Sequence, residues 1–169
     1  MEFEKVLRER KSTRLFSSKE VEEEKLLQIL EAARVAPTAK NAQPFKILVV
    51  RSKEGIKKVD NATRCRYKAP ICLIVCADKE KAYNKKNGHS YVDIDASIVT
   101  THMMLEATNV GVDNIWIGLF NEEIVKEEFE LDDNMIPVCM LMIGYKSRLC
   151  PPNPFHNSRK SLDEIVEYR

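Results

Sequence analysis

The amino-acid sequence predicts an α+β fold in which helices flank a central sheet. Three short apolar segments rich in β-branched residues predict strands, and segments with helical spacing of apolar residues separate them. The predicted strands and helices are too few for a complete doubly wound α/β fold, so a sandwich of sheet and helices agrees better with the sequence. With 169 residues, 44% of them hydrophobic, the chain is long enough for a substantial core, and we expect a single domain over residues 1–169.

The first part of the chain is predicted to alternate between helix and strand. Residues 3–7 form a short amphipathic segment. Ser17 and Glu20 have the spacing of a capping box, which places a helix start there, and its apolar face would comprise Leu26, Leu27, Leu30 and Ala33. This helix should end near Pro37, because a residue before proline is pushed out of the α region. Residues 45–50 then predict a strand and residues 52–61 a modest helix.

The second part contains the longest predicted helix, residues 91–110, which should end at Gly111. Apolar residues lie on two stripes of this helix, so we expect burial nearly all round, at the centre of a domain or in a dimer interface. The other elements expected are a buried strand at 71–77, a surface loop at 79–90, a turn or short strand at 115–120, a short helix at 122–129, a core strand at 138–145 and a short helix or arm at 161–168.

Composition excludes several classes of function. The formal net charge is +1, so no overall field would attract nucleic acid or an acidic membrane, and we expect neither partner. The N-terminus lacks the apolar run of a signal peptide and no segment is long enough to span a membrane, which favours a cytoplasmic protein. The three histidines are scattered without ligand spacing, so no metal site is expected. The five cysteines form no Cys-x-x-Cys pair, and we expect Cys72 and Cys76 to be buried on one side of their strand.

A basic cluster, Arg10-Lys11-Ser12-Thr13-Arg14, is the first candidate for a binding site. A guanidinium is a planar fork of donors that fits a phosphate in two-point contact, and hydroxyls add neutral donors. Alone, such a cluster is more often a solvated basic face. A second segment, residues 36–45, follows a predicted helix and precedes a predicted strand. Its presence shifts the interpretation of the basic cluster from a solvated face toward a binding site.

Together these segments resemble the FMN-dependent nitroreductase family, which opens with an Arg-Arg-Ser-Ile-Arg-like motif followed by a helix ending in Ala-Pro-Ser-x-x-Asn-x-Gln-Pro-Trp. The matching residues here are Arg10 to Arg14, then Pro37-Thr38, Asn41 and Gln43-Pro44-Phe45. The helix at 91–110 followed by residues 111–118, and Ile143-Gly144-Tyr145 followed by a Pro-rich loop and Arg159-Lys160, also look like the family. Thr38 and Phe45 are mild departures, and residues 111–114 differ from the family's Gly-Leu-Gly-Thr. The chain is also short for the family, which leaves little sequence to cover an active site.

The resemblance implies a three-layer sandwich with a central mixed or antiparallel sheet, in an intertwined homodimer with FMN at the interface. Three groups of FMN-binding residues follow from it. The phosphate clamp would comprise Arg10, Lys11, Ser12 and Arg14, closed by Arg159 or Lys160. The flavin edge would be met across the interface by Pro37, Thr38, Ala39, Asn41 and Gln43, with either Lys40 or Lys46 as a cation. Trp116, Ile117 and Gly118 would lie near flavin N5 and the dimethylbenzene ring. Without the family context, Asn41 and Gln43 equally suit a turn, and Trp116 equally suits a core.

The implied activity is that of an oxidoreductase, in which NADH or NADPH reduces FMN and the FMN then reduces a nitroaromatic, a quinone or a similar electron-poor acceptor by ping-pong hydride transfer. No catalytic acid or nucleophile is expected, because the cofactor carries the chemistry. Three alternatives stay open: an FMN-binding protein without general reductase activity, specialised flavin chemistry on the same fold, and a flavin-free domain whose basic cluster only solvates a helix end. The sequence does not disclose the physiological acceptor or the preferred nicotinamide.

Overall fold

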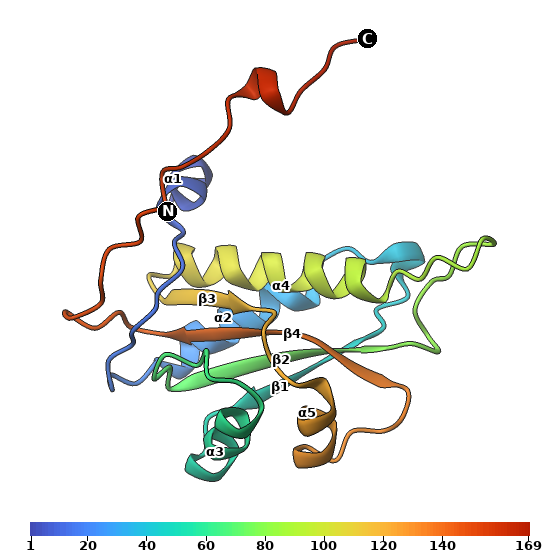
Figure 1. Cartoon of the computed structure of the whole chain (residues 1–169), viewed down its shortest axis with the longest axis horizontal. Coiled ribbons are helices and arrows are strands. Elements are labelled where there is room, and N and C mark those ends of the chain that lie inside the picture. Colours follow the sequence, from blue (N-terminus) through green and yellow to red (C-terminus); the bar gives the residue numbers. More distant parts are fainter.

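The computed structural model describes all 169 residues and contains a four-stranded sheet flanked by helices (Figure 1). The strands lie in the order β1-β2-β4-β3, and every neighbouring pair is antiparallel. The strands are β1 (Phe45–Val50), β2 (Ile71–Asp78), β3 (Asp113–Ile117) and β4 (Met135–Gly144). The predicted α+β fold is confirmed, and its sheet is antiparallel rather than mixed.

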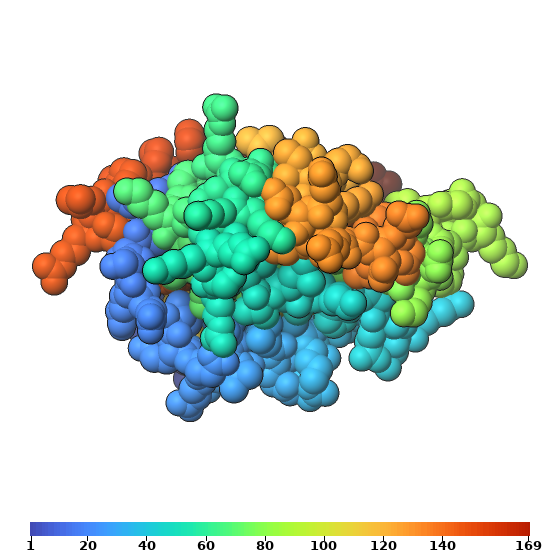
Figure 2. Space-filling view, turned by 90° about the horizontal axis from the view of Figure 1, so that it is seen from below, coloured from blue at the N-terminus to red at the C-terminus, as the bar shows by residue number.

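Helices cover both faces of the sheet and make three layers. On one face, α2 (Glu23–Arg34) and α4 (Val92–Asn109) pack into a core cluster that includes Ile29, Leu73 and Met103. On the other face, α3 (Lys53–Ala62) and α5 (Glu122–Glu128) cover a second cluster that includes Val59, Ile74 and Met142. Figure 2 shows α3 and α5 side by side on this face. Because both faces are covered, all residues of β2 are buried, which explains its continuous apolar sequence.

Local sequence signals account for several boundaries. The Ser52 hydroxyl caps α3 by accepting a hydrogen bond from the Gly55 amide at 3.0 Å. Gly111 has a φ of +75°, which confirms its predicted role directly after the long helix. Cys72 and Cys76 both lie in the cluster beneath α3 and α5, so the prediction that they share one buried side is confirmed.

The predicted capping box at Ser17 and Glu20 is wrong. Helix α2 begins at Glu23, and its N-cap residue Glu22 makes no side-chain capping bond. The Ser17 hydroxyl instead donates to the Tyr145 carbonyl at 3.0 Å, and the Ser17 amide donates to the same oxygen at 2.8 Å. Pairing with the end of β4 therefore holds Ser17 in extended backbone and delays the start of the helix.

Two apolar helix faces are less buried than predicted. Leu27 of α2 is 57% exposed, while Ile29, which the predicted face omits, is fully buried. In α4, the stripe that contains Val99 and Met103 is buried in the core, but Ile94, on the other stripe, is 37% exposed. The rest of that stripe is partly buried, with Ile98 packed against the core and Leu105 in a groove beside α1 and α2. Burial nearly all round is therefore incomplete within one chain.

The last two strands begin earlier than predicted. β3 includes Asp113 and Asn114, and β4 starts at Met135 and passes through Pro137. The register between β2 and β4 shifts between Val75 and Cys76, where an extra residue of β4 stands between the partners of those two residues. Such a bulge accommodates a proline that cannot donate to the ladder.

The two ends of the chain extend beyond the sandwich. Helix α1 (Phe3–Glu9) lies near one end of α4, and the C-terminal residues run past it as an arm (Figure 1). Of the two alternatives predicted for residues 161–168, the structure has the arm, which contains a single 3₁₀ turn, Leu162–Glu164. None of the helices is long and apolar enough to cross a membrane. No group of three or more His, Cys, Asp or Glu side chains is arranged to hold a metal ion.

Candidate functional site

The basic segment of residues 10–14 lies along the edge strand β3. Ser12 forms a parallel bridge with Asn114, and the Thr13 amide donates to the Asn114 carbonyl at 3.0 Å. Further along, the Phe16 amide donates to the Tyr67 carbonyl at 3.0 Å. The backbone of this segment is therefore fixed by the sheet, and its side chains project from a defined position.

Alternation along this extended segment separates its side chains into two groups. Thr13 is only 1% exposed and points into the protein interior, so the side chains of Ser12 and Arg14 point outward. Arg14 lies beside Tyr67, whose pKa is raised by burial and by the neighbouring Cys65 thiol, while the Arg14 charge acts against that rise. Lys11 is on the other side of the chain, where it lines a cleft of about 560 Å³.

Arg10 and Arg159 come together from opposite ends of the chain. Burial lowers the pKa of Arg10, and the nearby charge of Arg159 lowers it further. Arg159 is itself oriented by two hydrogen bonds, from Nη1 to the Phe155 carbonyl at 3.1 Å and to the Ser158 carbonyl at 2.6 Å. Lys160 is exposed on the arm. Of the two residues that could close the predicted clamp, Arg159 is therefore the one that interacts with Arg10.

The segment from Pro37 to Gln43 forms a tight loop between α2 and β1. Lys40, Asn41 and Gln43 all have positive φ values, of 54°, 54° and 49°. For residues other than glycine, this left-handed conformation costs on the order of 1 kcal/mol or more each, and such strain is often found at functional sites. Lys40 lies over the Tyr83 ring at 4.5 Å.

Two hydrogen bonds close this loop. The Gln43 amide donates to the Thr38 hydroxyl at 3.0 Å, and the Ala39 amide donates to Asp95 Oδ1 of α4 at 2.9 Å. The side chains of Asn41 and Gln43 are exposed, and the Gln43 Nε2 donates to the Asn41 carbonyl at 3.2 Å. Sequence reasoning missed Asp95, although its spacing from Val92 and Val99, on the apolar stripe of the helix, was a visible signal.

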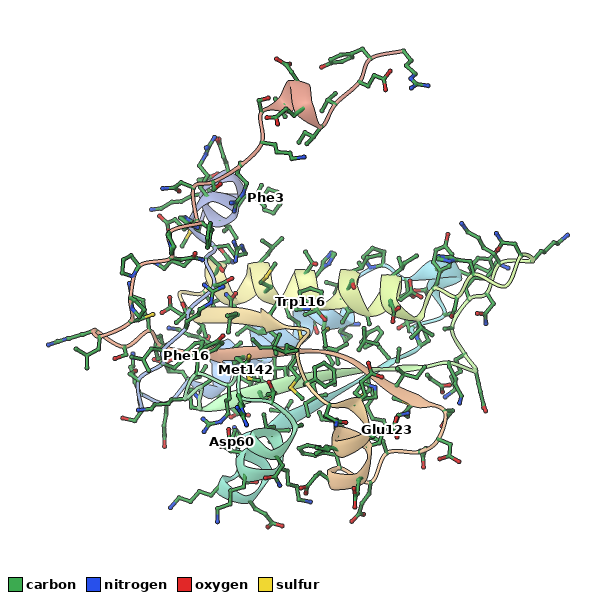
Figure 3. All side chains as sticks on the ribbon, in the orientation of Figure 1. Phe3, Phe16, Asp60, Trp116, Glu123 and Met142 are labelled. Atoms are coloured by element: carbon green, nitrogen blue, oxygen red, sulfur yellow. The ribbon has the colours of Figure 1, made fainter.

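The end of β3 contains the third predicted group. Trp116 is half-buried and packs against the core beneath α4, and Figure 3 shows it between the strand and that helix. Ile117 is buried on the opposite face. Gly118 is exposed, and a Cβ placed on it would meet no atom within 4 Å. This backbone is therefore open to close approach by a planar ligand.

Within one chain, the basic segment of residues 10–14 and the loop from Pro37 to Gln43, called the Asn41 loop, lie at opposite ends of α4 (Figure 1). Ala39 is bonded near the start of that helix, whereas Asn114 follows its end. A helix of 18 residues is about 27 Å long, so the two groups lie well apart within one chain.

A scan against family models matches the model described as the Nitroreductase family over residues 7–70 and 66–145. A protein of Archaeoglobus fulgidus, provisionally named an NADH dehydrogenase/NAD(P)H nitroreductase, is 28% identical over 148 residues, which cover 83% of each chain.

Solved structures have the same fold. A nitroreductase family protein from Clostridium difficile 630 is 42% identical with a TM-score of 0.93, and the match covers 99% of this chain and 98% of that one. A nitroreductase-type protein from Exiguobacterium sibiricum, solved in complex with FMN, has a TM-score of 0.85 at 21% identity, covering 100% of this chain and 98% of the other. At that identity the second likeness shows the fold alone.

Proposed function

The chain belongs to the nitroreductase family, and on this basis we propose that it is an FMN-dependent oxidoreductase that uses NADH or NADPH to reduce nitroaromatics, quinones or similar electron-poor acceptors. The single observation that carries the proposal is the Arg10–Arg14 segment, which is held along β3 by its backbone contacts with Asn114 and whose first arginine lies near Arg159. Two guanidinium groups that repel each other form a favourable site for a dianionic phosphate.

The residues of the clamp fit the phosphate and ribityl chain of FMN. Arg10 and Arg159 would hold the phosphate, and the Ser12 hydroxyl and the Arg14 guanidinium lie on the outward side of the same segment. Lys11 would contribute charge from the other side rather than a direct contact. FMN bound to a similar fold in the Exiguobacterium sibiricum protein supports this choice of ligand.

We propose that the functional unit is a homodimer with FMN at the interface. Exposed apolar residues gather around the partly buried stripe of α4: Phe3 of α1 is 65% exposed, and Leu27 and Val35 lie at the same surface. Figure 3 shows Phe3 projecting from α1 into open space. A patch of this kind is typical of an interface. Burying it against a second copy would also allow the partner's Asn41 loop to approach this chain's clamp.

The chain supplies binding and orientation. When bound, FMN would take a hydride from NADH or NADPH and pass two electrons to the acceptor. The amides of Asn41 and Gln43 would donate to the pyrimidine edge and favour the negative charge of the reduced ring, and the open backbone at Gly118 would leave its face accessible. The provisional name of the Archaeoglobus fulgidus relative supports the nicotinamide donor. The cytoplasmic location stays a prediction.

Steady-state turnover tests this proposal. Purified protein saturated with FMN should oxidise NADH or NADPH in the presence of a quinone or a nitroaromatic. In size-exclusion chromatography, the protein should elute as a dimer with the flavin still bound. A protein that holds FMN but gives no turnover with either nicotinamide would be a flavin-binding protein of another kind, and the proposed reductase activity would be wrong.

A further inference from the structure

Asp95 is a carboxylate in the buried part of an apolar helix. Asp95 is only 1% exposed. Its neighbours along the same face of α4 are Val92, Ala96 and Val99, which belong to the main core. Charged residues are almost never fully buried unless they are paired. Asp95 has no ion pair, and its Oδ2 has no hydrogen-bond partner. A group retained at this cost requires an explanation.

The explanation is not helix capping. Tyr91 is the N-cap residue of α4 and makes no side-chain capping bond, and the first amide of the helix, that of Val92, donates to the Ser90 hydroxyl at 3.4 Å. Asp95 is the fourth residue of the helix, close enough to its N-terminus for the partial positive charge there to stabilise a carboxylate. This position lowers the free-energy cost of burying the charge, but it does not explain why a carboxylate is present there.

The only side-chain hydrogen bond of Asp95 reaches the flavin-edge loop, defined here as residues 38–43. Its Oδ1 accepts from the Ala39 amide at 2.9 Å, directly before the first left-handed residue, Lys40. The loop is closed at its other end by the bond from the Gln43 amide to the Thr38 hydroxyl. A conformation with three left-handed residues persists only if its surroundings fix it.

We propose that Asp95 is a positioning residue for FMN binding, which acts by fixing the flavin-edge loop through Ala39. The loop is then preset with Asn41 and Gln43 directed outward before the ligand arrives, so that binding need not supply the free energy of ordering them. This inference rests on the proposed function for the identity of the ligand, while the link between Asp95 and the loop stands on the geometry alone.

The test compares Asp95→Leu, which fills a similar volume without an acceptor, with Asp95→Asn, which keeps an acceptor oxygen. Asp95→Ala serves as a second loss variant, and Asp93→Asn, at an exposed position of the same helix, is the matched control. Two quantities are measured: hydrogen exchange of the amides from Ala39 to Gln43 in the FMN-free protein, and FMN affinity from flavin fluorescence.

We expect loss of a hydrogen bond to a charged group to speed exchange in the loop about 10-fold or more and to weaken FMN binding by about the same factor. Asp95→Asn should stay within about 3-fold of the wild type in both, since a neutral acceptor remains. Asp93→Asn should change neither quantity.

Three results would overturn the proposal: unchanged loop exchange in Asp95→Leu, faster exchange spread through α4 and the sheet, or a loosened loop with unaltered FMN affinity. Failure of the wild-type protein to bind FMN would refute the proposed function instead. Even then, exchange in the loop would still decide whether Asp95 fixes it.

Discussion

Arg10 and Arg159 approach each other closely enough for the charge of Arg159 to lower the pKa of Arg10, in addition to the effect of partial burial. Neither guanidinium forms an ion pair with a carboxylate of the chain. Two like charges that approach without a counter-charge disfavour the folded state unless an anion binds. The relationship therefore supports the proposed phosphate site, which would be built from the two ends of the sequence.

Replacing either arginine should weaken FMN binding. Arg10→Gln and Arg159→Gln each remove a charge-assisted contact worth about 1.5–3 kcal/mol, which corresponds to a loss of roughly 10-fold to 150-fold in affinity. Flavin fluorescence titration measures the change. Arg169→Gln, which removes an exposed arginine from the same arm, is the control and should leave the affinity unchanged. Equal affinity in all three variants would mean that the phosphate lies elsewhere.

A charge placed on the partly buried stripe of α4 should separate the proposed dimer. Leu105→Glu puts a carboxylate into the apolar groove beside Phe3 and Val35, and its desolvation would oppose association. We expect a monomer by analytical ultracentrifugation, together with weaker FMN binding because the partner's loop is lost. Lys57→Glu on α3, at an exposed position on the opposite side of the sheet, should remain dimeric. A dimeric Leu105→Glu variant would place the interface on another surface.

Stability in acid should depend on Tyr145. The Tyr145 hydroxyl donates to Glu22, and this bond, with smaller contributions that include the charges of Lys25 and Lys19, lowers the pKa of Glu22 to about 2. A carboxyl whose pKa is depressed on folding stabilises the protein above its ordinary pKa, and this stabilisation is lost as the pH falls toward 2. Tyr145→Phe should therefore reduce the pH dependence of the urea midpoint between about pH 4.5 and pH 2.

Glu22→Gln should reduce that pH dependence in the same way, because it removes the titrating group itself. If Tyr145→Phe retained the full pH dependence of the wild type, the hydrogen bond to Glu22 would not be its source.

The cysteines should differ in reactivity. Burial raises the pKa of Cys72 strongly, that of Cys76 to about 12 and that of Cys139 to about 11, so little thiolate forms near neutral pH. Cys65 and Cys150 are only half-buried. Brief treatment of the folded protein with iodoacetamide, followed by mass spectrometry, should label these two first. Rapid labelling of Cys72 without unfolding would contradict the observed packing of β2.

Much of the fold was predictable because its elements follow local rules. The apolar runs of β1 and β2, the hydroxyl cap at Ser52 and the glycine after the long helix each depend on a few neighbouring residues. Features that depend on distant partners were not predictable. The start of α2 is set by pairing of Ser17 with Tyr145, and the early start of β4 depends on a bulge opposite β2.

The candidate site shows the same division. The Arg10–Arg14 motif was visible in sequence, and the directions of its side chains follow from the burial of Thr13 and its backbone bond to Asn114. Asp95 was not predicted, since its role depends on a loop more than fifty residues earlier in the chain. The choice between Arg159 and Lys160 also required the path of the C-terminal arm. Pairwise contacts of this kind leave no periodic pattern in one sequence.

The absorbance spectrum of the purified protein with FMN, recorded before and after anaerobic addition of NADH and then NADPH, tests the central claim most directly. We predict a bound-flavin spectrum that bleaches with at least one of the two donors. A bound flavin that stays oxidised with both would contradict the proposed reductase activity. Failure to bind FMN at all would contradict the phosphate clamp formed by Arg10 and Arg159.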